Sequence, residues 1–449
     1  MTLHVRCGRL FTALEDTAQS DQTLVADAAG IITYAGPTAQ APRPERGDEV
    51  LDYSGLFVMP GLIDVHSHLS YGNAKTQEDI NLSQSLEFRA LRGLFFAQSV
   101  LSAGVTTMCS PGDSGRMSVA VRDAIAAGLF EGPRVTAAGR YLSSHQSLTD
   151  WYPTWVGVPE TSTGVLVTNR DSAIEEIRRQ VKDGVDCIKI AMDGFQTRPD
   201  GELIAAFTQA ETSAMVEEIH RLGRKAVVHA RGPEAVLYSA RAGVDLIFHA
   251  YYLNDECIDA MLASGSAIAP TLTFPRNIFE LSHPRDPASL KGLVALSRRE
   301  YEVACVNLRK AKEAGVPMMT GSDSGFAVTP YGEWHARELE IFVEGLGYTP
   351  AGALRAATEV SSRFTAQAGR IGTLAPGKLA DFIAVDGSPL DNIAVLQDKR
   401  RIQHIHIGGR KMHVAARPYD PRKVSDLALV NWNDLYTQER VAELRAMER

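Results

Sequence analysis

Two histidines one residue apart follow a short apolar run, in Asp64-Val65-His66-Ser67-His68. Residues two apart in a β-strand project to the same side, so both imidazoles would face the same way. Neutral imidazole is the commonest metal ligand in proteins. Such pairs also arise by chance, and His404 and His406 form another. The pair alone leaves open a metal site or an incidental spacing.

Two further histidines, His229 and His249, each end a strand-like apolar run and are each followed by alanine. A single buried histidine at a strand end is more often a hydrogen-bonded core residue than a ligand. Three strands that all deliver imidazoles to one rim instead favour a metal site.

An aspartate, Asp323, follows the apolar run Met318-Met319-Thr320-Gly321-Ser322. A carboxylate at the end of a strand could ligate a metal or take a proton from metal-bound water. It could equally cap the N-terminus of a following helix. Both interpretations remain open from the sequence.

A lysine, Lys189, lies inside a run that should be buried, Cys187-Ile188-Lys189-Ile190-Ala191. An unpaired buried ammonium is costly, so it either shifts its pKa or finds a partner. An internal salt bridge with Asp193 or Asp186 would satisfy it. The alternative is carboxylation by carbon dioxide, which turns the amine into a carbamate anion able to bridge cations.

These residues fall in a repeating pattern that begins near Phe57, where apolar runs of four to six residues alternate with amphipathic stretches. That alternation is typical of successive βα units and a parallel sheet. Eight runs predict an α/β fold of the (β/α)8 TIM-barrel type: 61–66, 105–108, 134–138, 186–190, 226–229, 245–249, 267–270 and 316–320. The C-terminal ends of barrel strands are where such enzymes keep their active sites.

Both ends of the chain instead carry short β-like runs separated by glycines, such as 31–36 and 402–407. We expect residues 1–57 and 369–420 to form one composite β-sandwich domain beside a catalytic barrel of residues 58–368. The charged tail, 421–449, holds Trp432 and Tyr436 and is expected to pack on the body. The sequence assigns it no role.

The composition limits the possible partners and the compartment. Against 46 basic residues stand 54 acidic ones, a net charge of −8, which argues against a dedicated nucleic-acid or anionic-membrane binder. The first ten residues include His4, Arg6 and Arg9, so we expect no signal peptide there. No apolar run reaches the roughly 18 residues of a membrane-spanning helix. Five scattered cysteines indicate neither a disulfide framework nor a zinc knuckle. We expect a cytoplasmic protein that acts on a small molecule.

Two longer motifs resemble those of a known family, the amidohydrolase superfamily. VMPGLIDVHSH at residues 58–68 looks like its opening strand motif, and LAPGKLADF at 374–382 looks like its closing sheet motif. RDAIAAG at 122–128 with GPR at 132–134 is similar to the prolidase-like and imidazolonepropionase-like branch. The resemblance spans nearly the whole chain and implies a (β/α)8 barrel with a small composite β domain.

The resemblance also implies a binuclear metal site, usually zinc, with manganese, cobalt or iron as alternatives. It places His66 and His68 on one metal, His229 and His249 on the other, a carboxylated Lys189 between them, and Asp323 beside the bridging hydroxide. Two cations would lower the pKa of the shared water and polarise the scissile carbonyl, while Asp323 passes a proton to the leaving nitrogen. Deaminating relatives are generally mononuclear and lack this lysine, so Lys189 favours hydrolysis of an acyl–nitrogen bond.

Four residues are candidates for binding substrate. His145 follows the third strand, where this branch often carries a histidine that touches the substrate carbonyl; the alternative is a surface histidine. Arg231, two residues beyond His229, could hold a carboxylate or bridge carboxylates of the barrel. Trp151 and Tyr152 belong to an aromatic loop that either lines the pocket or packs elsewhere.

We therefore predict a metal-dependent hydrolase of an amide, carbamate or urea, on an aromatic or xenobiotic substrate, working as a homo-oligomer. A prolidase-like dipeptidase or carboxypeptidase, or an N-acyl amino acid hydrolase, is one alternative. Opening of a cyclic amide, as in imidazolonepropionase, is a second. The third, from another class, is a catalytically silent barrel that only binds.

Overall fold

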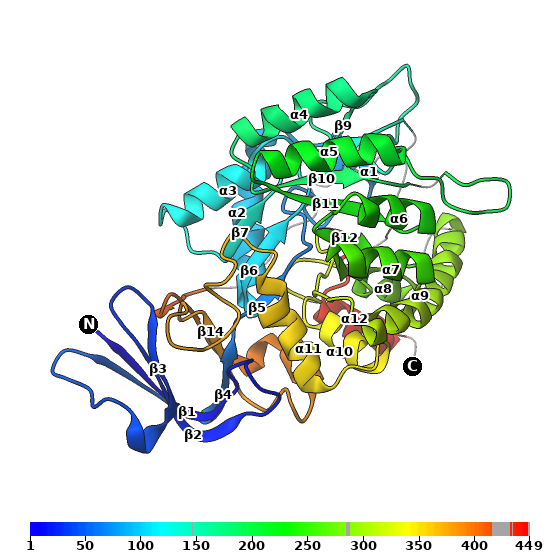
Figure 1. The fold of residues 1–449 in the computed structure, drawn as a ribbon. Helices are drawn as coiled ribbons and strands as arrows, with labels where there is room; N and C mark the ends of the chain where they lie inside the picture. Colours follow the sequence, from blue (N-terminus) through cyan, green and yellow to red (C-terminus); the bar gives the residue numbers. More distant parts are fainter. Residues whose placement is uncertain (146, 195, 284–287, 415–431, 433, 448–449) are drawn as a thin grey trace.

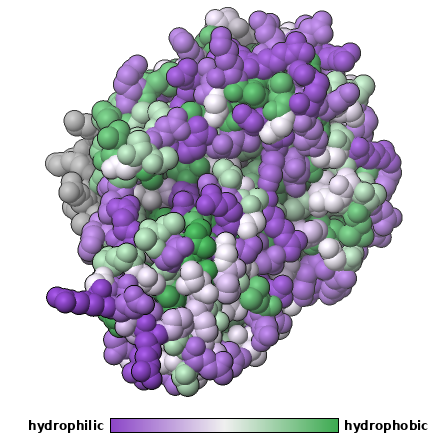
Figure 2. Space-filling model, turned by 60° about the vertical axis from the view of Figure 1, so that its left-hand side comes forward, coloured by the Kyte–Doolittle hydropathy of each residue, from purple (hydrophilic) through white to green (hydrophobic). Residues whose placement is uncertain are grey.

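The computed structural model describes residues 1–145, 147–194, 196–283, 288–414, 432 and 434–447. Parallel strands wrapped by helices form the larger region, and strands from both ends of the chain form a sheet at its side (Figure 1). Among the described residues, no helix combines the length and apolar character needed to cross a membrane. On the face drawn in Figure 2, hydrophilic and hydrophobic side chains are interspersed.

The parallel strands fall into two hydrogen-bonded sheets. One is three-stranded, in the order β5 (Leu62–Asp64), β6 (Val105–Ser110), β7 (Arg134–Ala137). The other is six-stranded, in the order β13 (Ala267–Ala269), β12 (Leu246–His249), β11 (Lys225–Ala230), β10 (Cys187–Ala191), β8 (Tyr141–Ser143), β9 (Gly164–Leu166).

Isolated bridges continue the ladder where the named strands stop. A parallel bridge between Ala138 and Cys187 connects the two sheets, and another joins Ile268 to Met318 in the predicted eighth run. The run then turns back to the first strand, because the amide of Val65 donates to the carbonyl of Thr320 at 3.0 Å. This is a TIM-barrel-type α/β arrangement, so the coarse fold prediction is confirmed.

Helices follow the strands and cover the outside of the barrel (Figure 1). Those described are α1 (Gln77–Asn81), α2 (Leu86–Ser102), α3 (Met117–Ala126), α4 (Arg170–Lys182), α5 (Gln209–Arg221), α6 (Pro233–Arg241), α7 (Asp255–Ser264), α8 (Thr273–Leu281), α9 (Ala288–Ala314), α10 (Arg337–Glu344), α11 (Pro350–Arg355) and α12 (Gln438–Met447).

Local sequence explains where several of these helices begin and end. The side chain of Asn169 accepts from the amide of Ser172 to cap α4, and Thr208 caps α5 through the amide of Glu211. Helix α7 ends at Gly265, whose φ of 79° is left-handed and costs a glycine little. These local signals therefore fix where these helices begin and end, and the chain can then turn back to the next strand.

The sheet at the side is built from both chain ends. Its order is β16 (Arg410–Lys411), β15 (Ile402–Ile407), β14 (Phe382–Val385), β4 (Glu49–Pro60), β1 (Leu3–Leu10), β2 (Gln19–Ala26), β3 (Ile32–Pro37). Strand β4 pairs with β1 in parallel and with β14 antiparallel, and it leads directly into β5. We expected a two-layer sandwich, whereas the described strands of the two ends join one seven-stranded sheet.

The tail lies partly outside the described residues, which here include only 432 and 434–447. Within that part Trp432 and Tyr436 are buried, and the amide of Tyr436 donates to the carbonyl of Ala327 at 2.9 Å. The described portion of the tail therefore packs on the loop that follows Asp323.

Candidate metal centre and active site

The predicted metal ligands gather at the C-terminal ends of the barrel strands. They line one cavity of about 310 Å³, together with aromatic and apolar side chains. The predicted ligands are His66, His68, Lys189, His229, His249 and Asp323. His66 and His68 both follow β5, and each of the others comes from a separate strand or from the turn after it. Parallel strands bring their C-terminal ends to one rim, which explains how residues so distant in sequence meet.

The ligand atoms lie close enough to share cations. The Nε2 atoms of His66 and His68 are 2.9 Å apart, and Oδ1 of Asp323 lies 3.6 and 3.4 Å from them. Ligand atoms of His66, His249 and Asp323 all fall within 4.8 Å of one another. The ring centres of His229 and His249 are 4.4 Å apart. His66, His249 and Asp323 therefore form a candidate metal-binding group.

Hydrogen bonds at the outer nitrogen set the tautomer of two histidines. Nδ1 of His68 lies 2.7 Å from the carbonyl of Gly112, which can only accept, so Nδ1 carries the proton. Nδ1 of His249 lies 2.6 Å from Oγ1 of Thr271, whose hydroxyl donates to the carbonyl of Pro270. With Nδ1 engaged in this way, Nε2 of each ring is the nitrogen that would serve as the metal ligand.

His229 faces Asp193. Its Nε2 lies 3.1 Å from Oδ1 of Asp193, but among the described residues neither atom makes a hydrogen bond, so the contact does not fix the tautomer of the ring. Asp193 is fully buried, and its other oxygen accepts from the amides of Arg231 and Gly232 at 2.7 and 2.8 Å. Asp193 thus ties the end of β11 to the end of β10 and places a carboxylate beside the ring of His229.

Burial favours the neutral form of three of the imidazoles. It lowers the pKa of His66, His229 and His249 well below the usual value, and nearby positive groups, Lys189 among them, add to the effect. A protonated imidazole cannot bind a metal ion. Neutral rings at pH 7 therefore suit the predicted role.

Lys189 is 1% exposed, and its Nζ has no hydrogen-bond partner among the described residues. Burial lowers its pKa to about 7, against an opposing effect of Asp323. The salt bridges that the sequence left open do not form: Asp186 accepts from Arg122 at 2.8 Å, and Asp193 contacts His229. The buried amine is left facing the cavity.

The backbone is strained at the same rim. His249, Ala250, Thr271 and Asp323 have φ values of 77°, 52°, 54° and 54°, in the left-handed region that disfavours residues with a Cβ. The amide of Asp323 donates to the carbonyl of His66 at 2.8 Å, which holds its turn in place. Such strain persists where the surroundings fix it, typically at functional sites.

A buried network behind His66 was missed from sequence. Oδ1 of Asp64 accepts from the amide of His66 at 2.9 Å, and Oδ2 lies 2.6 Å from Nδ1 of His335 and 2.5 Å from the hydroxyl of Ser322. Asp64 was visible in the opening motif as a carboxylate beside two histidines. His335 lies in no motif, and only the fold brings it here.

Two of the four predicted substrate-binding residues line the cavity, and two do not. Trp151 and Arg231 line the cavity, whereas His145 and Tyr152 are not among its lining residues. The His145 side chain is 58% exposed, with Nδ1 3.3 Å from Oδ2 of Asp150, as its surface alternative describes.

Arg231 is engaged by protein groups. Its Nη1 donates to Oε1 of Glu300 at 2.8 Å and its Nη2 to the carbonyl of Gly194 at 2.5 Å. Arg231 thus pairs with a carboxylate of the protein, as one of its two predicted roles describes, and it does so on the wall of the same cavity.

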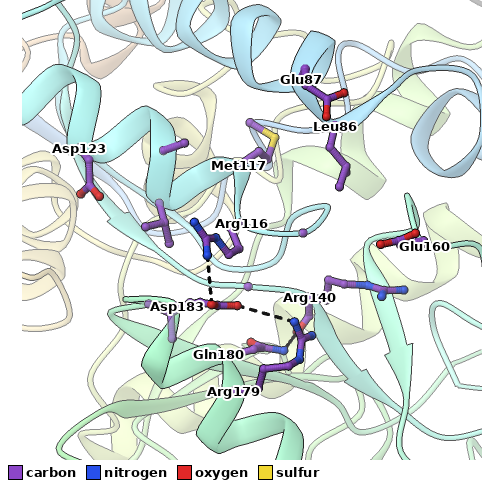
Figure 3. A pocket seen from close by; sticks show the side chains of 15 residues that line it. Leu86, Glu87, Arg116, Met117, Asp123, Arg140, Glu160, Arg179, Gln180 and Asp183 are labelled. Carbon is purple, nitrogen blue, oxygen red and sulfur yellow. Dashed lines mark hydrogen bonds and ion pairs between the residues drawn. The ribbon is translucent and has the colours of Figure 1, made fainter.

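A second hollow, of about 720 Å³, lies on the helices outside the barrel (Figure 3). Arg116 and Arg179, which line it, both pair with Asp183, at 3.2 and 3.6 Å. Its lining holds neither histidine nor cysteine. The histidine-lined cavity therefore holds the candidate chemistry.

Comparisons with known proteins agree with this site. The family model described as "Amidohydrolase family" matches residues 57–412. Ochratoxinase from Aspergillus niger is 28% identical over 404 residues, 85% of this chain and 80% of that protein. Imidazolonepropionase from Solibacter usitatus is 22% identical over 404 residues, 85% of this chain and 88% of that one.

Solved structures share the fold. A Xaa-Pro dipeptidase with methionine bound in its active site has a TM-score of 0.81 and 26% identity, over 92% of this chain and all (100%) of that one. The resemblance to the prolidase-like and imidazolonepropionase-like branch is thereby confirmed. The chain belongs to the amidohydrolase family and is a hydrolase that acts on carbon–nitrogen bonds.

Proposed function

We propose that this hydrolase uses a binuclear metal centre with a carboxylated Lys189 to cleave an amide, carbamate or urea bond of an aromatic or xenobiotic small molecule. The observation that carries the proposal is the position of Lys189. Its amine is buried, without a hydrogen-bond partner among the described residues, in a cavity lined by four histidines and Asp323.

The residues fit two divalent cations. His66 and His68 would hold one, His229 and His249 the other, and Lys189 and Asp323 complete the set, with zinc, manganese, cobalt or iron as candidates. Imidazole nitrogens and carboxylate oxygens are the donors that these metals take. A carbamate on Lys189 would supply two oxygens and a negative charge between the cations.

Carboxylation is chemically accessible to this lysine. With a pKa of about 7, a large share of the amines is neutral at pH 7, and only a neutral amine has a lone pair to attack carbon dioxide. The nitrogen forms a bond to the carbon, one proton leaves, and the product is an anion. That anion replaces a costly buried cation with a group that attracts metal ions.

The chain's own groups then manage the proton and the substrate. Bound divalent cations lower the pKa of water and polarise a carbonyl when they are present. Asp323 accepts the proton of the attacking water, and delivers it to the leaving nitrogen. Its Oδ1 is within 3.6 Å of His66 and His68, so it lies where the reacting water would be held.

The cavity supports a small substrate with an apolar part. Its volume of about 310 Å³ suits a small molecule, and aromatic and aliphatic side chains form much of its wall. Arg231 on the same wall favours, as a second candidate, an N-acyl amino acid or dipeptide whose carboxylate the guanidinium holds. Opening of a cyclic amide is the third candidate, suggested by the imidazolonepropionase relative.

A hydrolysis panel tests the proposal. The purified protein, supplied with zinc, manganese or cobalt and bicarbonate, is offered aryl ureas, aryl carbamates, N-acyl amino acids, Xaa-Pro dipeptides and cyclic imides. The proposal predicts metal-dependent turnover of open-chain amides, carbamates or ureas. Turnover confined to cyclic compounds contradicts it, and a protein that binds no metal and hydrolyses nothing is a silent barrel.

We also propose the finer architecture predicted from the sequence. Residues 58–368 would be the catalytic (β/α)8 barrel, and residues 1–57 and 369–420 the composite β domain. Pairing of β14 with β4 supports a single domain built from both ends.

A further inference from the structure

Three aromatic rings from distant parts of the chain form one wall of the active-site cavity. Phe274 lies in the first turn of α8, Phe326 lies in the loop after Asp323, and Trp432 comes from the tail. The ring centres lie 4.8 Å apart for Phe274 and Phe326, 5.5 Å for Phe326 and Trp432, and 6.0 Å for Phe274 and Trp432. We call these residues the aromatic wall.

Helix α9 places the aromatic wall away from Arg231. Leu293 on this helix packs against the cluster that contains Trp432, whereas Glu300 pairs with Arg231. Both residues line the cavity. Seven helical residues at 1.5 Å each separate the two positions by about 10 Å along the helix axis. A substrate that lies between them would therefore meet an apolar end and, at the other end, the Arg231–Glu300 ion pair.

Several hydrogen bonds that do not involve Trp432 hold the described tail on the body. The amide of Tyr436 donates to the carbonyl of Ala327 at 2.9 Å, and Nε1 of Trp334 donates to the carbonyl of Tyr436 at 2.7 Å. The side-chain amide of Gln438 donates to the carbonyl of Glu333 at 2.8 Å. These hydrogen bonds attach the described part of the tail to the loop after Asp323.

Trp432 is 4% exposed, and its Nε1 has no hydrogen-bond partner among the described residues. A tryptophan that served as an anchor would normally find an acceptor for this donor when buried. The indole instead contributes ring surface to the aromatic wall.

We propose that the aromatic wall is a subsite for a planar apolar group of the substrate, and that Trp432 is a specificity-determining residue supplied by the C-terminal tail. The inference rests on the proposed function, because it names which substrates that site prefers. Edge-to-face rings leave ring surface on which a flat aromatic group packs, and burial of that group removes it from water.

The experiment compares two substrates that differ only in the acyl group, N-acetyl-L-phenylalanine and N-(2-naphthoyl)-L-phenylalanine, on the full-length metal-loaded enzyme. Trp432→Ala is expected to lower kcat/KM for the naphthoyl compound at least about ten-fold more than for the acetyl compound, mainly through KM. Trp432→Phe, which keeps an aromatic ring, is expected to show a smaller change in the same direction.

Trp155→Ala is the matched control, because Trp155 is 84% exposed and does not line the cavity. It should leave the ratio of the two substrates unchanged. An equal loss for both substrates in Trp432→Ala and Trp432→Phe overturns the inference, because it indicates a structural role alone. Unchanged kinetics for both substrates overturn it as well.

Direct binding separates this inference from the proposed function. If the wild-type enzyme cleaves neither compound, the hydrolysis panel decides the proposed function, and calorimetry with 2-naphthoate as the probe still measures the subsite. Wild-type binding that weakens at least about ten-fold in Trp432→Ala supports the aromatic subsite. No binding, or equal binding by both proteins, overturns it.

Discussion

Nζ of Lys189 lies 3.8 Å from the centre of the Phe248 ring. A cation over an aromatic face gains roughly 0.5–2 kcal/mol. Burial outweighs that gain, because the pKa of Lys189 still falls to about 7. The pocket therefore tolerates the ammonium poorly, and a carbamate anion that meets two metal ions would resolve the conflict.

Replacement of Lys189 should remove the metal bridge. Lys189→Ala is expected to lose most bound metal and activity, because the site loses two carbamate oxygens. Acetate or propionate should restore part of the activity by placing a carboxylate in the vacated space. Metal analysis and hydrolysis assays with and without these acids measure the effect.

Lys182→Ala is the control for that experiment, because Lys182 is an exposed residue in the last turn of α4. It should keep its metal and its activity. Full activity in Lys189→Ala would exclude the carbamate.

The depressed pKa of Lys189 also predicts how stability depends on pH in the metal-free protein. Between the folded value of about 7 and the unfolded value of 10.5, the unfolded chain binds the extra proton. The free energy of unfolding should therefore rise with pH across this window, by up to about 1.4 kcal/mol per pH unit, and lose that gain as pH falls to 7.

Chemical denaturation of chelator-treated protein in bicarbonate-free buffer measures this slope. Lys189→Met, which keeps an unbranched side chain without a charge, should lack the rise between pH 7 and 10. Wild-type protein and variant with identical slopes would mean that the ammonium is not destabilised in the folded state.

Asp193 should matter for metal binding through His229. Asp193→Asn keeps the shape of the side chain but removes the negative charge that lies 3.1 Å from Nε2 of His229, so the imidazole loses a favourable electrostatic neighbour. Metal affinity is expected to fall about 10- to 100-fold, as for other carboxylates behind a metal-binding histidine. Zinc titration against a competing chelator measures it.

Asp183→Asn is the comparison for Asp193, because Asp183 lies on the outer helices and pairs with Arg116. It should leave zinc affinity unchanged. An Asp193→Asn protein with wild-type zinc affinity would show that the aspartate only ties the two strands together.

Arg231 should discriminate between substrates with and without a carboxylate. Removal of Arg231 alone would leave the buried Glu300 carboxylate without its ion-pair partner. The double variant Arg231→Met/Glu300→Gln is therefore the test. KM should rise about ten-fold or more for N-acetyl-L-phenylalanine but not for N-acetylphenethylamine, which lacks the carboxylate. Equal rises for both compounds would assign Arg231 a purely structural role.

The barrel was predictable because its signals are local and repeated. Apolar runs and capped amphipathic helices mark each βα unit, and residues at strand ends must share one rim whatever the loops do. The six predicted ligands accordingly line one cavity: His66, His68, Lys189, His229, His249 and Asp323. The single sheet formed by the chain ends was less predictable, because a sheet and a sandwich share the same strand pattern.

The positions of residues in the loops and in the tail could not be predicted from the sequence. His145 and Tyr152 lie outside the cavity lining, because no periodic pattern fixes where a loop folds. His335 and Thr271 contact the site through pairings that depend on the folded barrel. Trp432 lines the cavity from a tail whose Tyr436 is bonded to Ala327, a long-range pairing that no local sequence pattern marks.

The metal content of the purified enzyme tests the central claim most directly. Elemental analysis of the full-length protein, prepared without chelator and with bicarbonate, should find close to two divalent ions per chain, and hydrolysis should disappear on chelation and return with metal. A protein that holds no divalent metal, and gains no activity from zinc, manganese or cobalt, would contradict the account.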